Sequence, residues 1–249
     1  MIRLLALLAM AIPAMAQACP APSETVLFHS CWGEAQATSL LLPEESPVPK
    51  TPAERLVVTG GYTGKDVRVD EKPNPVGMFV HRGQVINPTL ARMDGIVILT
   101  SNGNLEVQHR MRAGLAGQRF DLTDLDQRRA FQQAARDSGA TVFQSHLLIV
   151  EGALDIRPPE TPKRAIRRIL FTDGAGYGIY QTKSIVSLYD AAREVAEALS
   201  PTMAINLDMG SYDYCLATRS GIEVNCGVLA RENTQKLSNL LVLSLQPRG

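Results

Sequence analysis

The late cysteine pair, Cys215 and Cys226, constrains the fold of this 249-residue chain more than any other feature of its sequence. Between the two cysteines lies Ser220-Gly221, a dipeptide that suits a two-residue hairpin turn. With this turn, Arg219 faces Ile222, and the register of the two strands places Cys215 opposite Cys226. The spacing therefore predicts a β-hairpin that is closed by a cross-strand disulfide.

The N-terminus indicates the compartment in which such a disulfide can form. A basic residue precedes the apolar run 4–12, and Ala14-Met15-Ala16 supplies the small residues that signal peptidase recognises. We therefore expect a signal peptide over residues 1–16 and an exported protein, periplasmic or secreted. A membrane anchor is one alternative, but crossing a bilayer takes about 20 apolar residues and this run is about half as long. Lipidation of Cys19 is another, and the polar Gln17 suits it poorly.

Export changes what the other two cysteines mean, because an oxidising compartment favours disulfides over thiolates or zinc sites. Once Cys215 and Cys226 are paired, Cys19 and Cys31 pair by default and tie down the mature N-terminus. Small loops of this size each contribute about 2 to 3 kcal/mol to stability. Buried free thiols are the alternative to both disulfides.

The charge balance limits the partners of the chain. The 25 basic side chains equal the 25 acidic ones in number, so the formal net charge is zero. No bulk field then attracts duplex nucleic acid or an anionic membrane surface. We expect no nucleic-acid partner, and no integral membrane association once the signal peptide is removed.

A proline-rich stretch divides the chain into unequal parts. Residues 43–52 carry repeated prolines, which predict an extended connector. We expect an N-terminal extension over residues 17–54, which holds the early disulfide and this connector. The main domain is expected over residues 55–249, a length that fits one domain.

Short apolar segments predict many strands and few helices in the main domain. Strand-like segments lie at 56–59, 76–81, 96–100, 105–108, 147–150, 169–172, 179–181, 203–207 and 240–245. The first four, separated by glycine-containing turns, predict a β-meander. Helical patterns lie at 123–138 and after Ser187, which forms a capping-box-like pair with Asp190. The order predicts an α+β fold: a single compact domain with a mixed, largely antiparallel β-sheet and two or three packed helices.

Several common catalytic patterns are missing from the sequence. The glycines at 174–178 lack the spacing of a dinucleotide-binding loop, and those at 60–64 lack the spacing of a phosphate-binding loop. The four histidines lie far apart and show no zinc-binding spacing, although distant histidines can still meet in space. There is no GxSxG nucleophile elbow. Local motifs therefore indicate no metal site, and the sequence identifies no cofactor.

Three segments place polar side chains where a purely apolar core would exclude them. The strand at 203–207 runs into Asp208, and the amides of the following turn can hold a carboxylate that serves as an acid, a base or a ligand-orienting group. Gln144 and His146 share one face of a strand by its two-residue period. Arg167 enters a third strand. A turn-capping role for Asp208 and a structural role for the histidine are the alternatives.

In order and spacing, six segments resemble the phosphodiester glycosidase family. The counterparts here are Thr59-Gly60-Gly61-Tyr62, Pro75-Val76-Gly77-Met78, the stretch 144–152, Arg167, the helix after Ser187, and Asn206-Leu207-Asp208-Met209-Gly210-Ser211. The resemblance covers about residues 55 to 245. It implies an α+β hydrolase that acts on a sugar-1-phosphate diester, so the implied partner is a glycan or sugar-phosphate substrate.

The resemblance also implies roles for particular residues. Cleavage of a sugar-1-phosphate diester builds charge on the phosphate and oxocarbenium character on the sugar, which calls for a carboxylate and for cationic or amide donors. The implied carboxylate is Asp208, the implied phosphate clamp is Arg167, and Gln144 with His146 are implied donors or a proton shuttle. The implied substrate-binding residues also include Asn206, Thr59 and Ser211. Arg164 and Arg168 are rivals to Arg167 for the phosphate.

Three positions depart from the family pattern: Thr59 replaces Asn, His146 stands near the usual Gly-Pro, and Met209 replaces the first Gly after the Asp. A glycine at that last position can adopt a positive φ or let a sugar approach the backbone, whereas methionine obstructs both. Two hypotheses remain. The chain is an exported hydrolase of a glycosyl phosphodiester or related envelope glycan, or a non-catalytic exported protein of the same fold that binds a glycan or another envelope component.

Overall fold

The computed structural model describes residues 18–41, 54–66 and 72–246 of the chain. The predicted signal peptide (1–16) and the proline-rich connector (43–52) lie outside the described residues. Within those residues, no helix is long and apolar enough to cross a membrane.

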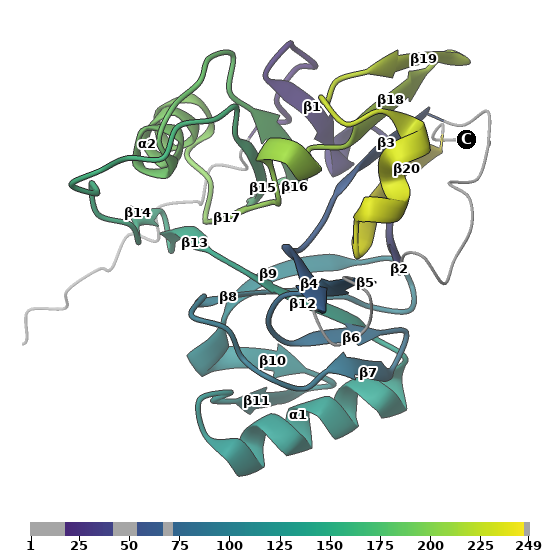
Figure 1. Cartoon of the computed structure of the whole chain (residues 1–249), viewed down its shortest axis with the longest axis vertical. Coiled ribbons are helices and arrows are strands. Elements are labelled where there is room, and N and C mark those ends of the chain that lie inside the picture. The colour runs from purple at the N-terminus through teal and green to yellow at the C-terminus, as the bar shows by residue number, and fades with distance from the viewer. Residues whose placement is uncertain (1–17, 42–53, 67–71, 247–249) are drawn as a thin grey trace, which may run out of the picture.

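Three sheets carry most of the strands (Figure 1). The first sheet has the order β1 (Val26–His29), β16 (Gly176–Gln181), β15 (Arg168–Asp173), β17 (Met203–Asn206), β13 (Leu147–Val150) and β14 (Ala153–Leu154). The second has the order β19 (Ile222–Asn225), β18 (Cys215–Arg219), β3 (Glu54–Thr59), β20 (Asn239–Gln246) and β2 (Glu34–Leu41). The third has the order β7 (Gln84–Asn87), β6 (Phe79–His81), β12 (Thr141–Ser145), β8 (Gly95–Leu99) and β9 (Leu105–His109).

The remaining elements are small. Two further strand pairs are β4 (Thr63–Asp66) with β5 (Lys72–Pro75), and β10 (Ala113–Leu115) with β11 (Gln118–Phe120). The α-helices of the described residues are α1 (Leu125–Ser138) and α2 (Leu188–Leu199), and the short 3-10 helices are η1 (Ser30–Trp32), η2 (Arg110–Arg112), η3 (Gly210–Tyr212) and η4 (Arg231–Lys236). The predicted α+β class is confirmed, but the strands divide among several antiparallel sheets instead of forming one mixed sheet.

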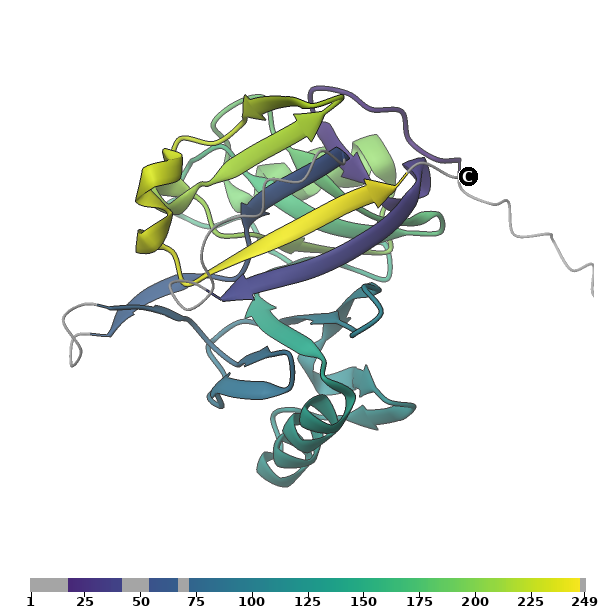
Figure 2. The ribbon, with the colours of Figure 1, turned by 90° about the vertical axis from the view of Figure 1, so that its right-hand side faces the viewer.

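The sheets are arranged around one large apolar core. The first and second sheets face each other and the third packs beneath them (Figures 1 and 2), and all three contribute buried side chains such as Ile205, Leu243 and Val97. Helix α1 covers the other face of the third sheet with Phe131. Helix α2 covers the other face of the first sheet with Val195. Each helix therefore buries one apolar stripe against one sheet, as amphipathic helices do.

The N-terminal segment is part of this domain and does not form a separate extension. Strand β1 pairs with β16 in the first sheet, and β2 pairs with β20 over the whole length of both strands in the second. Residues 17–54 were predicted to be an extension because pairing between strands about 150 to 200 residues apart leaves no local signal.

The predicted meander is also corrected. Strand β3 lies in the second sheet, away from the other three strands of that prediction. In the third sheet β12 lies between β6 and β8, where Val142 pairs with Val80 on one side and with Ile98 on the other. The two hairpins β6–β7 and β8–β9 are therefore separated by a strand that enters later in the chain.

Both predicted helices are confirmed, and so is the predicted capping pair of α2. The carboxylate of Asp124 accepts hydrogen bonds from two first-turn amides of α1, and Gly139 ends the helix at a φ of +65°. At α2, Ser187 Oγ accepts from the amide of Asp190 (3.0 Å) and donates to its carboxylate (2.8 Å). These caps satisfy the orphan amides that begin each helix.

Both predicted disulfides are present, Cys19–Cys31 and Cys215–Cys226. Arg219 faces Ile222 in the β18–β19 hairpin, as the turn predicts. Ser220 and Gly221 both have a positive φ, 49° and 78°, which is the backbone of a type I′ turn. Two disulfides fit an exported protein.

Candidate functional site

Asp208 follows β17 and is held by backbone amides from two loops. Its own amide donates to the carbonyl of Gly60 (3.0 Å). One carboxylate oxygen accepts from the amide of Thr63 and the other from the amide of Met209, both at 2.9 Å. The side chain is therefore fixed at the end of a strand, where the sequence places it.

The carboxyl of Asp208 is buried without a cationic partner. The residue is 4% exposed, and among the described residues no basic side chain forms an ion pair with it. Burial raises the pKa of Asp208 to about 6, although the amides of Thr63 and Met209 oppose that rise by stabilising the charged form. A carboxyl with this pKa changes its protonation state close to neutral pH, so it can give or take a proton.

Tyr62 lies beside Asp208, and no role for it was predicted from the sequence. Its hydroxyl accepts a hydrogen bond from Asn206 Nδ2 (2.6 Å), and its ring meets the edge of the His146 ring at a centroid distance of 5.6 Å. Burial raises the pKa of Tyr62 to about 12. The phenol therefore stays protonated at neutral pH and can act as a neutral hydrogen-bond donor.

The loop that carries Tyr62 depends on glycine. A side chain on Gly60 would collide with Oδ1 of Asn239, and the same oxygen accepts from the amide of Gly61 (2.8 Å). The Gly-Gly-Tyr sequence was thus the available signal for Tyr62, because two glycines permit this close packing.

Asn206, the last residue of β17, contacts the same loop as Asp208. It is 1% exposed, and its Nδ2 also donates to the carbonyl of Leu207 (2.6 Å). Its Oδ1 has no hydrogen-bond partner among the described residues. Asn206 reaches the loop through Tyr62 and Asp208 reaches it through Thr63, so both side chains meet one loop.

His146 lies at the crossing between two sheets. It is placed between β12 and β13, where the chain passes from the third sheet to the first (Figure 1). The residue is exposed, yet partial burial of the ring lowers its pKa, with Asp94 opposing the shift. The ring is therefore mainly neutral at pH 7 and offers one donor and one acceptor.

Arg167 is the one of the three candidate arginines whose pKa is affected by Tyr62. It precedes β15 and is half-buried, and its Nε donates to the carbonyl of Val186 (3.3 Å). Burial lowers the pKa of Arg167, and Tyr62 opposes that shift.

The two rival arginines have other partners. Arg168 is fully buried, and its guanidinium donates to Asp213 and to Gln181, each at 2.5 Å. Arg164 is exposed and lies 3.8 Å from the carboxylate of Asp190. Because neighbouring residues of a strand point to opposite faces, Arg167 and Arg168 go to different environments.

Gln144 and Thr59 are committed to the protein's own backbone. Gln144 Oε1 accepts from the amides of Met78 (3.2 Å) and Ala91 (2.8 Å), and its Nε2 donates to the carbonyls of Ala91 and Met93. Those four bonds fill the capacity of a side-chain amide. Thr59 Oγ1 donates to the carbonyl of Tyr212 (2.5 Å) and accepts from the amide of Tyr214 (2.9 Å).

Residues 209–211 continue from Asp208 into η3. Met209 has a φ of −143°, so its position needs no glycine, and its side chain packs inward where Sδ accepts from Arg168 Nη1 (3.7 Å). Gly210 takes the positive φ instead, at 80°. Ser211 is exposed on η3. Methionine in place of glycine thus leaves the backbone at Asp208 unstrained.

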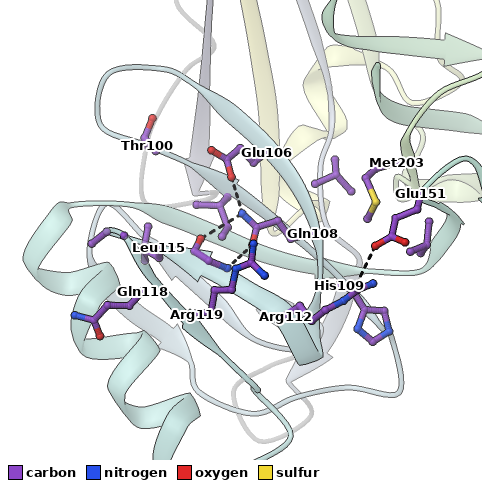
Figure 3. A pocket seen from close by; sticks show the side chains of 16 residues that line it. Thr100, Glu106, Gln108, His109, Arg112, Leu115, Gln118, Arg119, Glu151 and Met203 are labelled. Carbon is purple, nitrogen blue, oxygen red and sulfur yellow. Dashed lines mark hydrogen bonds and ion pairs between the residues drawn. The ribbon is translucent and has the colours of Figure 1, made fainter. Parts of the chain in front are cut away.

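A hollow of about 570 Å³ lies elsewhere, between β9, the β10–β11 hairpin and the residues Val150, Glu151 and Met203 (Figure 3). Its charged side chains face solvent: Arg112 and Glu151 form an ion pair at 2.9 Å while their side chains are 57% and 72% exposed. Asp208 does not line it. The exposed carboxylate of Glu151 in this hollow therefore lacks the desolvated environment that Asp208 has.

Potential metal ligands come together at the Cys19–Cys31 disulfide. In the part of the chain that the structure describes, Cys19, His29 and Cys31 are the one group of three such residues within reach of one another. No group of this kind surrounds Asp208 among those residues.

Comparisons with known proteins give only a weak match. No family model and no curated protein matches the chain. The catalytic domain of zebrafish N-acetylglucosamine-1-phosphodiester alpha-N-acetylglucosaminidase, auto-inhibited by its pro-peptide, is similar with a TM-score of 0.48 and 13% identity over 88% of this chain and 74% of that one. A hypothetical protein from Synechocystis is similar with a TM-score of 0.47 and 11% identity over 85% of this chain and 57% of that one. These values describe a resemblance in overall structure alone.

Proposed function

We propose that the chain is an exported hydrolase that cleaves a sugar-1-phosphate diester or a related envelope glycan at Asp208. One observation carries this proposal: the buried carboxyl of Asp208 has a pKa of about 6, has no cationic partner among the described residues, and is held by the amides of Thr63 and Met209. A structural carboxylate is usually paired when it is buried, whereas a catalytic one has its pKa tuned towards the working pH.

In the proposed reaction, Asp208 accepts the proton of the attacking water. Water attacks the anomeric carbon, the bond from that carbon to the phosphate oxygen breaks, and a phosphate monoester leaves. The carboxylate of Asp208 takes the proton from the attacking water and stabilises the positive charge that develops on the sugar. With a pKa of about 6, this carboxylate is ionised at neutral pH and basic enough to accept the proton.

The neighbouring groups serve the two ends of the substrate. Arg167 supplies positive charge to the phosphate, while its Nε and Nη2 are held by the carbonyls of Val186 and Lys163. The neutral phenol of Tyr62 and the ring of His146 can donate to sugar hydroxyls or to the leaving oxygen. Asn206 orients Tyr62 through the 2.6 Å hydrogen bond. Gln144 and Thr59 stabilise the loops behind the site and do not touch the substrate in this scheme.

The test is an assay of the purified protein on a panel of sugar-1-phosphate diesters, run beside Asp208→Asn. The matched control is Glu151→Gln, which removes an exposed carboxyl in the hollow of Figure 3. We expect Asp208→Asn to lose about 10²- to 10⁴-fold in turnover and the control to keep full turnover.

Two outcomes would contradict the proposal. Equal turnover by the native protein and Asp208→Asn would remove Asp208 from the mechanism. Saturable glycan binding without product, even at high protein concentration, would favour a non-catalytic exported protein that binds a glycan or another envelope component.

A further inference from the structure

The N-terminal disulfide lies against a buried histidine. His29 is completely buried, and one ring nitrogen of it lies within 4.8 Å of both Cys19 Sγ and Cys31 Sγ, which are themselves bonded to each other. Two sulfurs and an imidazole nitrogen make a set of ligands that suits zinc. This cluster plays no part in the function proposed above.

The orientation of His29 is the one that metal-binding histidines have. Its Nε2 faces a carboxylate oxygen of Asp173 at 3.2 Å, and its Nδ1 accepts from the amide of Cys31 at 3.1 Å. The ring proton therefore lies on Nε2, and the Nδ1 lone pair points to the cysteine side. A carboxylate that receives the second ring N–H of a histidine is the usual support of a histidine ligand.

The carboxylate of Asp173 is itself fixed. Its other oxygen accepts from the amides of Ala175 (2.8 Å) and Gly176 (2.9 Å), which belong to the turn between β15 and β16. His29 is thus held by a rigid turn of the first sheet, and it ends β1, which pairs with β16. The nitrogen ligand is preorganised.

The two cysteine sulfurs can move apart to bind a metal ion. Zinc bonds to sulfur are about 2.3 Å long, so a tetrahedral site needs its two sulfurs about 3.8 Å apart, and the disulfide must be reduced first. Cys19 lies in an exposed segment without regular structure, which can move. Its neighbour Pro20 accepts a hydrogen bond from Trp32 Nε1 (2.6 Å), so Cys19 stays near Cys31 after reduction.

We propose that Cys19, Cys31 and His29 form a zinc site that alternates with the disulfide. A thiol or phosphine reductant supplies two electrons, and the disulfide takes up two protons to become two thiols. Zn²⁺ then binds both sulfurs with release of the two protons, and binds His29 Nδ1 in place of the amide of Cys31, with water as the fourth ligand. Reoxidation of the cysteines expels the ion.

The late disulfide is a control within the same chain. In the described residues, Cys215 and Cys226 have no histidine or carboxylate that completes a group of three ligands. A protein with Cys215→Ser and Cys226→Ser keeps only the early pair, and one with Cys19→Ser and Cys31→Ser keeps only the late pair. Each protein loses one disulfide that closes a loop of similar size, so the loss of stability affects both proteins alike.

The experiment measures zinc uptake by both proteins, with and without a phosphine reductant, in competition with a chromophoric chelator. We expect one equivalent of Zn²⁺ in the reduced protein that keeps Cys19 and Cys31, and none in its oxidised form or in the protein that keeps the late pair. Circular dichroism in each state establishes that the chain is folded.

A further variant separates a built site from two cysteines that bind zinc without help. Asp173→Asn keeps an acceptor for the turn amides but can place an NH₂ group against Nε2, which moves the ring proton to Nδ1. We expect zinc affinity to fall about 10- to 100-fold. No zinc uptake by the reduced early pair would overturn the proposal. Equal uptake by the late pair, or unchanged affinity in Asp173→Asn, would also overturn it.

Discussion

Asp208 and Asp213 follow the same strand, and both are buried, but their charges are compensated in different ways. Asp213 lies 2.5 Å from the guanidinium of Arg168, which is itself completely buried. Asp208 is held by the amides of Thr63 and Met209 and by the side chain of Thr63, has no cationic partner among the described residues, and has a pKa raised to about 6. The comparison teaches that burial beside a cation keeps one carboxylate charged, whereas burial without one raises the pKa of the other.

The ion pair belongs to a network that supports the loop after Asp208. Besides Asp213, the guanidinium of Arg168 donates to Gln181 on β16 and to the carbonyls of Tyr214 and Cys226 in the disulfide hairpin. Arg168 therefore joins the first sheet to that hairpin. The hairpin and the ion pair hold the loop from one side, while Asp208 contacts the loop at 60–63 from the other.

The largest effect is expected when the ion pair is broken. Arg168→Met leaves Asp213 buried without its cation, which should lower the free energy of unfolding by about 3 to 5 kcal/mol. Chemical denaturation measures this loss. The matched control, Arg164→Met, removes an exposed arginine and should change stability by less than about 0.5 kcal/mol. A loss below about 1 kcal/mol for Arg168→Met would mean that buried Asp213 does not depend on its cation. It would contradict the difference between the two carboxylates.

A smaller effect of opposite sign is expected at Asp208. Its pKa is raised above the ordinary value of 3.8, so the native state binds more protons than the unfolded state between about pH 4 and 6. The contribution of Asp208 to stability therefore falls as pH rises through this window. Asp208→Asn removes that dependence, so its stability relative to the native protein should rise by about 2 to 3 kcal/mol from pH 4 to pH 7.5.

Denaturation curves of both proteins across this pH range measure the difference. Glu151→Gln serves as the control, because it removes an exposed carboxyl. A stability difference between Asp208→Asn and the native protein that stays constant with pH would contradict a raised pKa.

The smallest effect is expected at Tyr62. Tyr62→Phe removes the acceptor of the Asn206 hydrogen bond but keeps the ring against His146. Stability should fall by about 1 kcal/mol, the usual value of one hydrogen bond. If the proposed reaction is right, kcat/KM on a sugar-1-phosphate diester should fall about tenfold, which is about 1.4 kcal/mol of transition-state stabilisation. Unchanged kcat/KM with lower stability would leave Tyr62 a structural role alone.

The sequence was sufficient to predict turns and helix ends, because their contacts join residues only a few positions apart. The turn at Ser220-Gly221 fixes the register of its own hairpin, and the caps of α1 and α2 lie within four residues of the groups that they bind. Asp208 was predicted for the same reason, because one of its two amide partners is the next residue.

Long-range packing decided what the sequence did not predict. Tyr62 reaches the site because its loop folds against residues 206–208, about 145 positions away. Gln144 and His146 were assigned a shared face by strand period, but β12 ends at Ser145, and the chain then leaves the third sheet. Gln144 therefore points into backbone partners while His146 meets Tyr62. The choice between Arg167 and Arg168 likewise depends on where β15 begins.

A titration of the Asp208 carboxyl tests the difference between the two carboxylates most directly. The carboxyl carbon can be followed by NMR from pH 3 to 8, and its signal is assigned by its absence in Asp208→Asn. We expect a midpoint near pH 6, as burial without a cation requires. A midpoint below pH 4 would mean that Asp208 is a stabilised structural carboxylate, and would contradict its assignment as the reactive group.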